Sequence, residues 1–129
     1  MESSRGLKIH FVHKPSSKTN AVPLLFCHGW PSSFTEILPL LNELTEPTEV
    51  NASEDAKTAF HVVAASIPGF GFSDASTDDE FGACATADVY DTLMKRLGYA
   101  RYFVHGDGWY VSQKNFICCT SVNPFTVYV

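Results

Sequence analysis

Short apolar runs along the chain predict the strands of a layered fold. Residues 7–13 alternate between apolar and polar side chains, which indicates a strand with one buried face. Residues 22–27 and 60–66 are almost continuously apolar, as expected of strands in a parallel sheet that is covered on both faces. A further short apolar run at residues 101–105 predicts a fourth strand.

Two stretches between these strands have helical periodicity. Apolar residues recur at helical spacing over 34–44, where the preceding serines are suitable N-caps and Pro39 is expected to kink or shorten the helix. A second helix is expected over 86–97, followed by Gly98 as its C-cap. Because strands alternate with helices, the predicted fold class is α/β, with a mostly parallel sheet and flanking helices.

Composition and charge exclude several classes of protein. The 129 residues allow one small domain, and 9 basic against 14 acidic residues leave a net charge of −5. An acidic chain without a basic block makes nucleic acid a poor partner. No apolar run approaches the roughly 20 residues of a membrane span. The first five residues lack the apolar core of a signal peptide, so a cytoplasmic location is expected.

Three glycine-containing segments follow predicted strands. Ligands of open α/β sheets bind at the carboxyl ends of the strands, which makes these segments candidate parts of a site. The first is His28-Gly29-Trp30-Pro31, where glycine allows the backbone to approach a ligand and an N–H group can act as an oxyanion donor. The alternative interpretation is a tight turn from strand to helix, which needs glycine and proline in any case.

The other two segments also have structural alternatives. Residues 66–74 form a glycine-rich loop without the sequence of a P-loop or a dinucleotide site, which disfavours phosphate binding. In residues 104–109, Asp107 lies between two glycines. It is either a nucleophile on a sharp strand-to-helix turn or a turn aspartate bonded to its own backbone. The spacing of His10, His13, His61 and His105 does not suit metal ligands, and each is expected to be a strand residue, so neither a metal site nor a cofactor is predicted.

Together these segments resemble the epoxide hydrolases of the α/β-hydrolase fold, most closely those of the microsomal type. The similarity covers most of the chain up to Trp109. It rests on residues 9–13, 23–25, 28–34, 60–63, 68–74 and 94–99. Haloalkane dehalogenases and some esterases share looser versions of the same motifs.

The resemblance implies a role for each site residue. Asp107 would open an epoxide to give an alkyl-enzyme ester, which a histidine-activated water then hydrolyses. Trp30 and Gly108 would supply the oxyanion hole. His28, Gly29 and Pro31 would support that loop, with a cis peptide bond before Pro31. The substrate would be a small-molecule epoxide.

The sequence departs from the family pattern at the nucleophile elbow. The family pattern is a small residue, any residue, Asp, Trp and Gly, whereas this chain has Gly106-Asp107-Gly108-Trp109-Tyr110. An ungapped alignment places Gly108 at the nucleophile position. If Asp107 is the nucleophile instead, His105 and Trp109 occupy the two positions that should hold small residues.

The family's acid, histidine base and cap tyrosines follow the elbow and have no match in this chain. We therefore expect residues 1–109 to be the N-terminal part of an α/β-hydrolase core domain, truncated after the elbow and inactive alone. Residues 110–129 are expected to be an unrelated, irregular tail. The alternatives are another α/β-hydrolase, such as a haloalkane dehalogenase or esterase, and a non-enzymatic binding module. The oligomeric state is not predicted.

Overall fold

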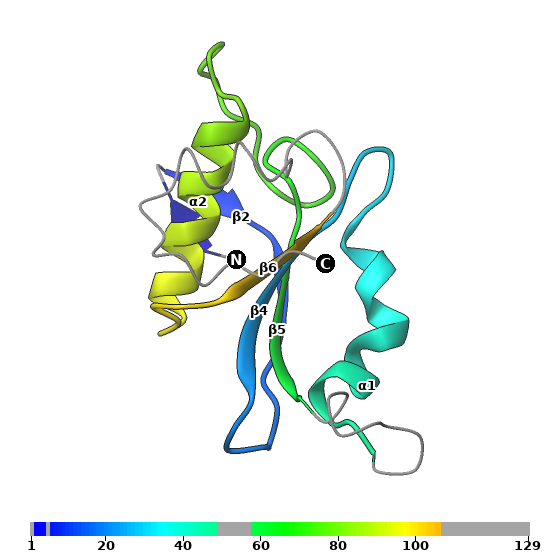
Figure 1. Ribbon diagram of the computed structural model, residues 1–129. Coiled ribbons are helices and arrows are strands. Elements are labelled where there is room, and N and C mark those ends of the chain that lie inside the picture. The colour runs from blue at the N-terminus through cyan, green and yellow to red at the C-terminus, as the bar shows by residue number, and fades with distance from the viewer. Residues whose placement is uncertain (1, 5, 49–57, 107–129) are drawn as a thin grey trace.

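A sheet flanked by helices forms the centre of the computed structural model, which describes residues 2–4, 6–48 and 58–106 (Figure 1). The elements, in chain order, are β1 (Glu2–Ser4), β2 (Leu7–Ile9), β3 (Phe11–Lys14), β4 (Val22–Cys27), the 3₁₀ helix η1 (Phe34–Leu40), α1 (Leu41–Thr45), β5 (Phe60–Ala65), α2 (Ala83–Arg96) and β6 (Phe103–Gly106).

The main sheet has four strands in the order β3-β5-β4-β6. Strand β4 runs parallel to both β5 and β6, whereas β3 is antiparallel to β5. The predicted α/β class with a mostly parallel sheet is therefore confirmed. Strands β1 and β2 form a separate antiparallel hairpin.

The two central strands are almost entirely apolar because helices cover both faces of the sheet. On one face, Leu25 and Val63 pack in a cluster with Tyr90 and Met94 of α2. On the other, Leu24, Phe26, Val62 and Ala64 pack with Ile37 of η1. Figure 1 shows α2 on one side of the sheet and η1 with α1 on the other. Burial on both faces thus accounts for the loss of strict alternation in the sequence.

The predicted single strand at residues 7–13 is divided in the structure, and this expectation was wrong. His10 separates β2 from β3. Its backbone N–H donates to Ser73 Oγ at 3.1 Å, and its carbonyl accepts the Ser66 N–H at 2.9 Å. The bond to Ser66 continues the register of β3 with β5 by one pair, but the His10 N–H bonds to the Ser73 side chain, so the ladder ends at His10.

The helices follow the predicted positions with altered boundaries. Pro39 lies inside the 3₁₀ helix η1, and α-helical geometry begins only at Leu41, so the first helix is shortened as predicted. Ser33 caps η1 by accepting the Thr35 N–H at 3.3 Å. Helix α2 begins earlier than predicted. Gly98, at φ +90°, follows its end as expected of a C-cap.

Candidate functional site

The carboxyl ends of β4, β5 and β6 lie side by side at one edge of the sheet. In the strand register, Cys27 pairs with both Ala65 and Gly106. The loop that begins at His28 and the loop that begins at Ser66 therefore start from adjacent strands. The structure thus brings together two of the three predicted segments and places the last described residue of the third beside them.

His28 joins the first of these loops to the second. Its side chain is buried, Nδ1 lies 3.2 Å from the Gly29 carbonyl oxygen, and Nε2 lies 3.4 Å from the Ile67 backbone nitrogen. A carbonyl oxygen can only accept and an N–H group can only donate, so the proton lies on Nδ1 of a neutral ring. With both ring nitrogens engaged, His28 holds the loops together and is not placed to act as a general base.

The turn that carries Trp30 is closed by a backbone hydrogen bond. The Ser32 N–H donates to the Gly29 carbonyl at 3.0 Å, and the Trp30–Pro31 peptide bond is cis, as the family resemblance implied. The Trp30 side chain is 73% exposed. Among the described residues, no hydrogen-bond acceptor faces the Trp30 N–H. This geometry suits a backbone donor that is free to meet an oxygen atom of a ligand.

The loop at residues 66–74, called the glycine loop below, closes on itself. The Gly69 N–H donates to the Asp74 carbonyl at 2.9 Å, and the Phe70 N–H donates to the Ile67 carbonyl at 2.9 Å. Gly69 and Gly71 adopt positive φ angles of +86° and +58°, which favour glycine. These amides serve the loop itself, so the arrangement gives no support to a phosphate cradle.

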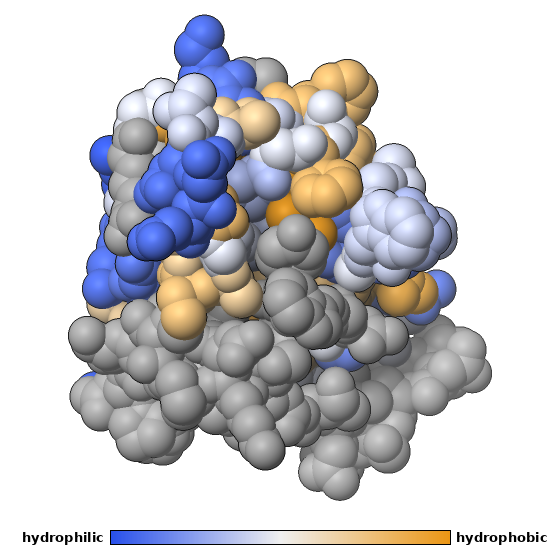
Figure 2. All heavy atoms as spheres, turned by 90° about the horizontal axis from the view of Figure 1, so that it is seen from above, coloured by the Kyte–Doolittle hydropathy of each residue, from blue (hydrophilic) through white to orange (hydrophobic). Residues whose placement is uncertain are grey.

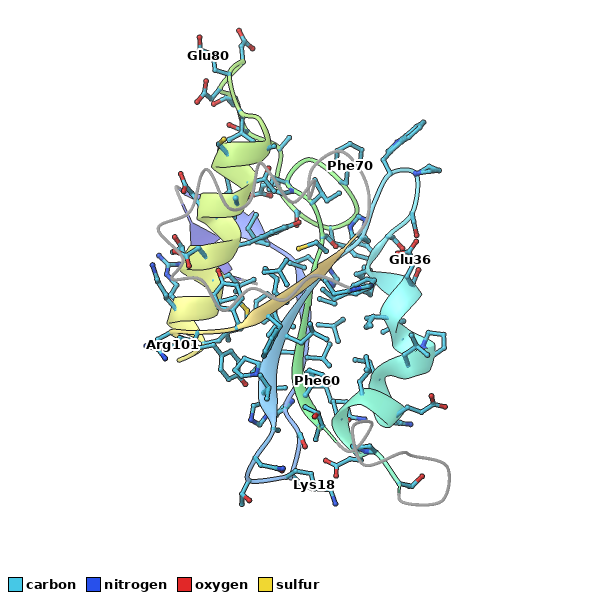
Figure 3. The ribbon with its side chains drawn as sticks, viewed as in Figure 1. Lys18, Glu36, Phe60, Phe70, Glu80 and Arg101 are labelled. Atoms are coloured by element: carbon cyan, nitrogen blue, oxygen red, sulfur yellow. The ribbon has the colours of Figure 1, made fainter. Side chains whose placement is uncertain are left out.

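Aromatic side chains of the glycine loop are exposed above the strand ends. Phe70 is 38% exposed and Phe72 is 65% exposed. Figure 3 shows Phe70 on this loop, at the same end of the sheet as Glu36 near the start of η1. Seen from above, this end of the molecule carries apolar side chains between more polar flanks (Figure 2). The edge is therefore a mixed surface that carries exposed aromatic groups of the glycine loop.

The predicted nucleophile and second oxyanion donor, Asp107 and Gly108, lie outside the described residues, as do residues 110–129. Strand β6 is described up to Gly106, the residue directly before Asp107. The His105 side chain is exposed, and its ring stacks on Phe26 with centroids 5.8 Å apart. His105 is thus a strand residue, as its position in the sequence indicated.

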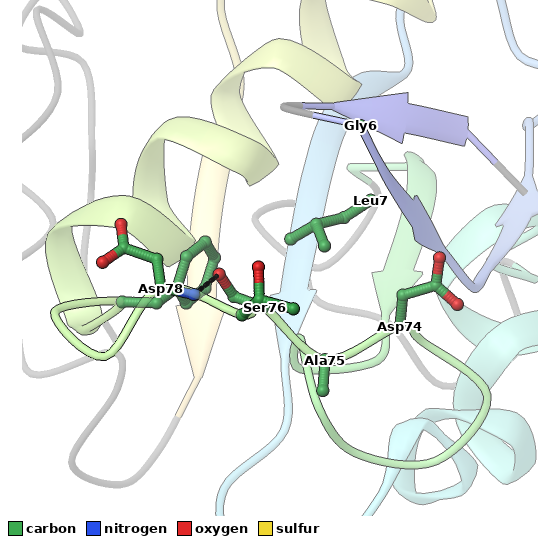
Figure 4. Close-up of a pocket in the computed structure, with 8 residues that line it drawn as sticks. Gly6, Leu7, Asp74, Ala75, Ser76 and Asp78 are labelled. Atoms are coloured by element: carbon green, nitrogen blue, oxygen red, sulfur yellow. Dashed lines mark hydrogen bonds between the residues drawn. The ribbon is translucent and has the colours of Figure 1, made fainter.

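A separate cavity of about 590 Å³ lies between the β1–β2 hairpin and the segment before α2 (Figure 4). It contains none of the predicted site residues. Both carboxylates that line the cavity accept hydrogen bonds from backbone N–H groups. Asp74 accepts the Lys8 N–H at 2.9 Å, and Asp78 accepts the Glu80 N–H at 3.0 Å. Within the described ranges there is no cluster of three or more potential metal ligands, and no helix has the length and hydropathy needed to cross a membrane.

Two family models match the chain. The model described as the epoxide hydrolase N terminus matches residues 1–37, and the model of the alpha/beta hydrolase fold matches residues 22–106. The second match covers β4 to β6, the elements that form the candidate edge.

Several proteins that are similar to this chain in sequence are named epoxide hydrolases. The chain is 40% identical over 109 residues to epoxide hydrolase 1 of Sus scrofa, covering 81% of this chain and 23% of that protein. It is 39% identical over 108 residues to the juvenile hormone epoxide hydrolase of Bombyx mori, covering 81% of this chain and 22% of that protein. The chain thus spans less than a quarter of the length of these relatives.

Solved structures show the same relationship. The crystal structure of juvenile hormone epoxide hydrolase from the silkworm Bombyx mori superposes with a TM-score of 0.68 at 38% identity, over 82% of this chain and 24% of that one. The Aspergillus niger epoxide hydrolase superposes with a TM-score of 0.69 at 37% identity, over 83% and 27%. The resemblance drawn from the sequence motifs is therefore confirmed.

Proposed function

Because this chain belongs to the α/β hydrolase fold family, we propose that it carries the oxyanion loop and the nucleophile strand of an epoxide hydrolase. The observation that carries the proposal is the register of β4 with β6, in which Cys27 pairs with Gly106. The turn with Trp30 follows β4, and the candidate nucleophile Asp107 follows in sequence the last described residue of the adjacent strand β6. Its substrate class is a small-molecule epoxide, as the names of the relatives suggest.

In the proposed first step, a carboxylate oxygen of Asp107 attacks an epoxide carbon. The carbon–oxygen bond of the epoxide breaks, an ester forms between the Asp107 carboxylate and that carbon, and the released alkoxide takes a proton from solvent water, which leaves hydroxide. In the second step, water attacks the ester carbonyl, and the oxygen that becomes negative accepts hydrogen bonds from the N–H groups of Trp30 and Gly108. Donors held in place for a developing charge stabilise the transition state more than the ground state.

The second step also needs a general base, and the family's histidine base, which follows the elbow, has no match in this sequence. All five histidines precede Asp107: His10, His13, His28, His61 and His105. His10 is bonded to Ser66, and His13 to Tyr99. A general base typically contributes on the order of 10²–10⁴ in rate. We therefore propose that this chain's own residues support ester formation but not efficient ester hydrolysis.

The test is the intact mass of the purified chain after incubation with styrene oxide. We expect a mass increase of one epoxide per chain, located at Asp107 by peptide mapping. The increase should be absent in Asp107→Asn and retained in the matched control Asp79→Asn, which removes an exposed carboxylate elsewhere.

Two results would contradict the proposal. If the wild-type chain gains no mass, Asp107 is not a nucleophile toward epoxides. If the chain releases diol over many turnovers and Asp107→Asn does not, the second step proceeds without the missing base. No observation favours a dehalogenase, an esterase or a binding module, so we make no second proposal.

A further inference from the structure

His10 contacts both loops of the candidate edge from the gap between β2 and β3. Its Nδ1 lies 2.9 Å from Ser66 Oγ, and its backbone N–H donates to Ser73 Oγ at 3.1 Å. Ser73 Oγ in turn donates to the Ser66 carbonyl at 3.0 Å. Ser66 is 1% exposed, so its hydroxyl depends on this partner in place of water. One histidine thus bonds to residues near the start and the end of the glycine loop.

The His10 ring also contacts the segment that follows the oxyanion turn, where the Phe34 ring lies edge-on at a centroid distance of 4.6 Å. The Phe72 ring, which belongs to the glycine loop, lies 5.1 Å from the His10 ring and 6.3 Å from the Phe34 ring. Phe34 is the first residue of η1, directly after the cap residue Ser33 and close in sequence to Trp30. The ring therefore lies between the glycine loop and the helix that anchors the turn carrying the Trp30 N–H.

We infer that His10 is a positioning residue that holds the glycine loop and the oxyanion turn in fixed relation to each other. The inference rests on the proposed function where it concerns the reaction, because a misplaced donor stabilises an oxyanion poorly. Two kinds of contact carry it: the hydrogen bond to Ser66 and the ring contact with Phe72 act on the glycine loop, and the ring contact with Phe34 acts on the oxyanion turn.

The same N-terminal segment provides a matched control. His13 is also a partly buried histidine, but it bonds Tyr99 OH through Nε2 at 2.9 Å. It pairs with Val63 in the sheet, away from the strand ends where Ser66 begins. His13→Ala thus removes a comparable imidazole and hydrogen bond without touching either loop of the candidate edge.

The first measurement is amide hydrogen exchange in the full chain. The reporters are the Gly69 N–H for the glycine loop and the Ser32 N–H for the oxyanion turn, both in backbone hydrogen bonds. In His10→Ala we expect exchange at both reporters to rise about tenfold, as for the loss of one net hydrogen bond. The Leu97 N–H at the end of α2 serves as the reference and should not change. In His13→Ala neither reporter should change relative to that reference.

Two conservative variants separate the contacts. His10→Asn places an amide near the position of Nδ1 and should restore protection at Gly69 but not at Ser32. His10→Phe keeps a ring beside Phe34 and Phe72 but loses the hydrogen bond to Ser66, so it should restore protection at Ser32 and restore it only in part at Gly69. If His10→Ala leaves the Ser32 exchange unchanged, the inference is overturned, because His10 then serves only its own loop.

The second measurement is the rate of ester formation at Asp107, followed by intact mass. In His10→Ala we expect the rate constant at saturating epoxide to fall about tenfold, with the half-saturating concentration changed less than about twofold. A wild-type rate in His10→Ala would overturn the positioning role. If the wild-type chain forms no ester but the exchange pattern is as described, the proposed function fails and the positioning of the two loops by His10 stands.

Discussion

Replacing Gly71 with alanine tests how closely the glycine loop packs on Ser66. Gly71 has a φ of +58°, and an added Cβ would lie 3.2 Å from Ser66 Oγ. The Ser66 hydroxyl is itself held at 2.9 Å from His10 Nδ1. The new methyl group can therefore be accommodated only if the hydroxyl moves away from its partner.

The expected loss of stability is the sum of two terms. An L-residue in the left-handed region costs roughly 1–2 kcal/mol relative to the right-handed region. Weakening a buried hydrogen bond costs roughly 0.5–1.5 kcal/mol. We expect Gly71→Ala to lower the free energy of unfolding by about 2 kcal/mol, taken from the low end of the first term and the middle of the second.

The assay is urea unfolding followed by circular dichroism, with a double-mutant cycle. Ser66→Ala removes the hydroxyl that the methyl group meets, so Gly71→Ala should cost about 1 kcal/mol less in that background. Gly98→Ala is the control: its φ is +90°, but no atom lies within 4 Å of the added Cβ. Its cost should be the same with and without the Ser66 hydroxyl. If the cost of Gly71→Ala is also unchanged, the close contact with Ser66 is refuted.

Three further substitutions test the core and the far end of β3. Tyr90 is 1% exposed and its hydroxyl has no hydrogen-bond partner among the described residues, so Tyr90→Phe should stabilise the chain by about 1 kcal/mol. Leu25 is fully buried, so Leu25→Ala should destabilise it by about 2–5 kcal/mol. Burial lowers the pKa of His13, and the neighbouring His61 lowers it further. As the pH falls below about 6.5, the unfolded chain takes up this proton before the folded chain, so stability decreases. His13→Gln should flatten this decrease between about pH 7 and pH 5.

Urea midpoints at neutral pH test the two core substitutions, and midpoints measured across the acid range test the third. A destabilised Tyr90→Phe would mean that the hydroxyl has a partner. A cost below about 1 kcal/mol for Leu25→Ala would mean that the core collapses around the missing methyl groups. An unchanged pH dependence in His13→Gln would assign the acid sensitivity to other groups.

The sequence alone determined those helices and strands that can be recognised from the residues within or next to them. The runs that became β4 and β5 were recognisable because both faces of these strands are buried, so nearly every position is apolar. The end of α2 was marked by Gly98, whose positive φ glycine adopts without the steric cost that a Cβ imposes on other residues. The family resemblance added the cis peptide bond before Pro31, which composition and periodicity do not predict.

Tertiary structure decided what depends on segments far apart in the chain. The break at His10 comes from partners up to 63 residues away, and His28 receives its N–H donor from a residue 39 positions away. The hydropathy pattern of a sequence indicates only whether a side chain is buried. It does not predict which residues far apart in the chain become hydrogen-bond partners. The antiparallel direction of β3 and the meeting of the loops after β4 and β5 depend on strand order and register, which are fixed only when the sheet assembles.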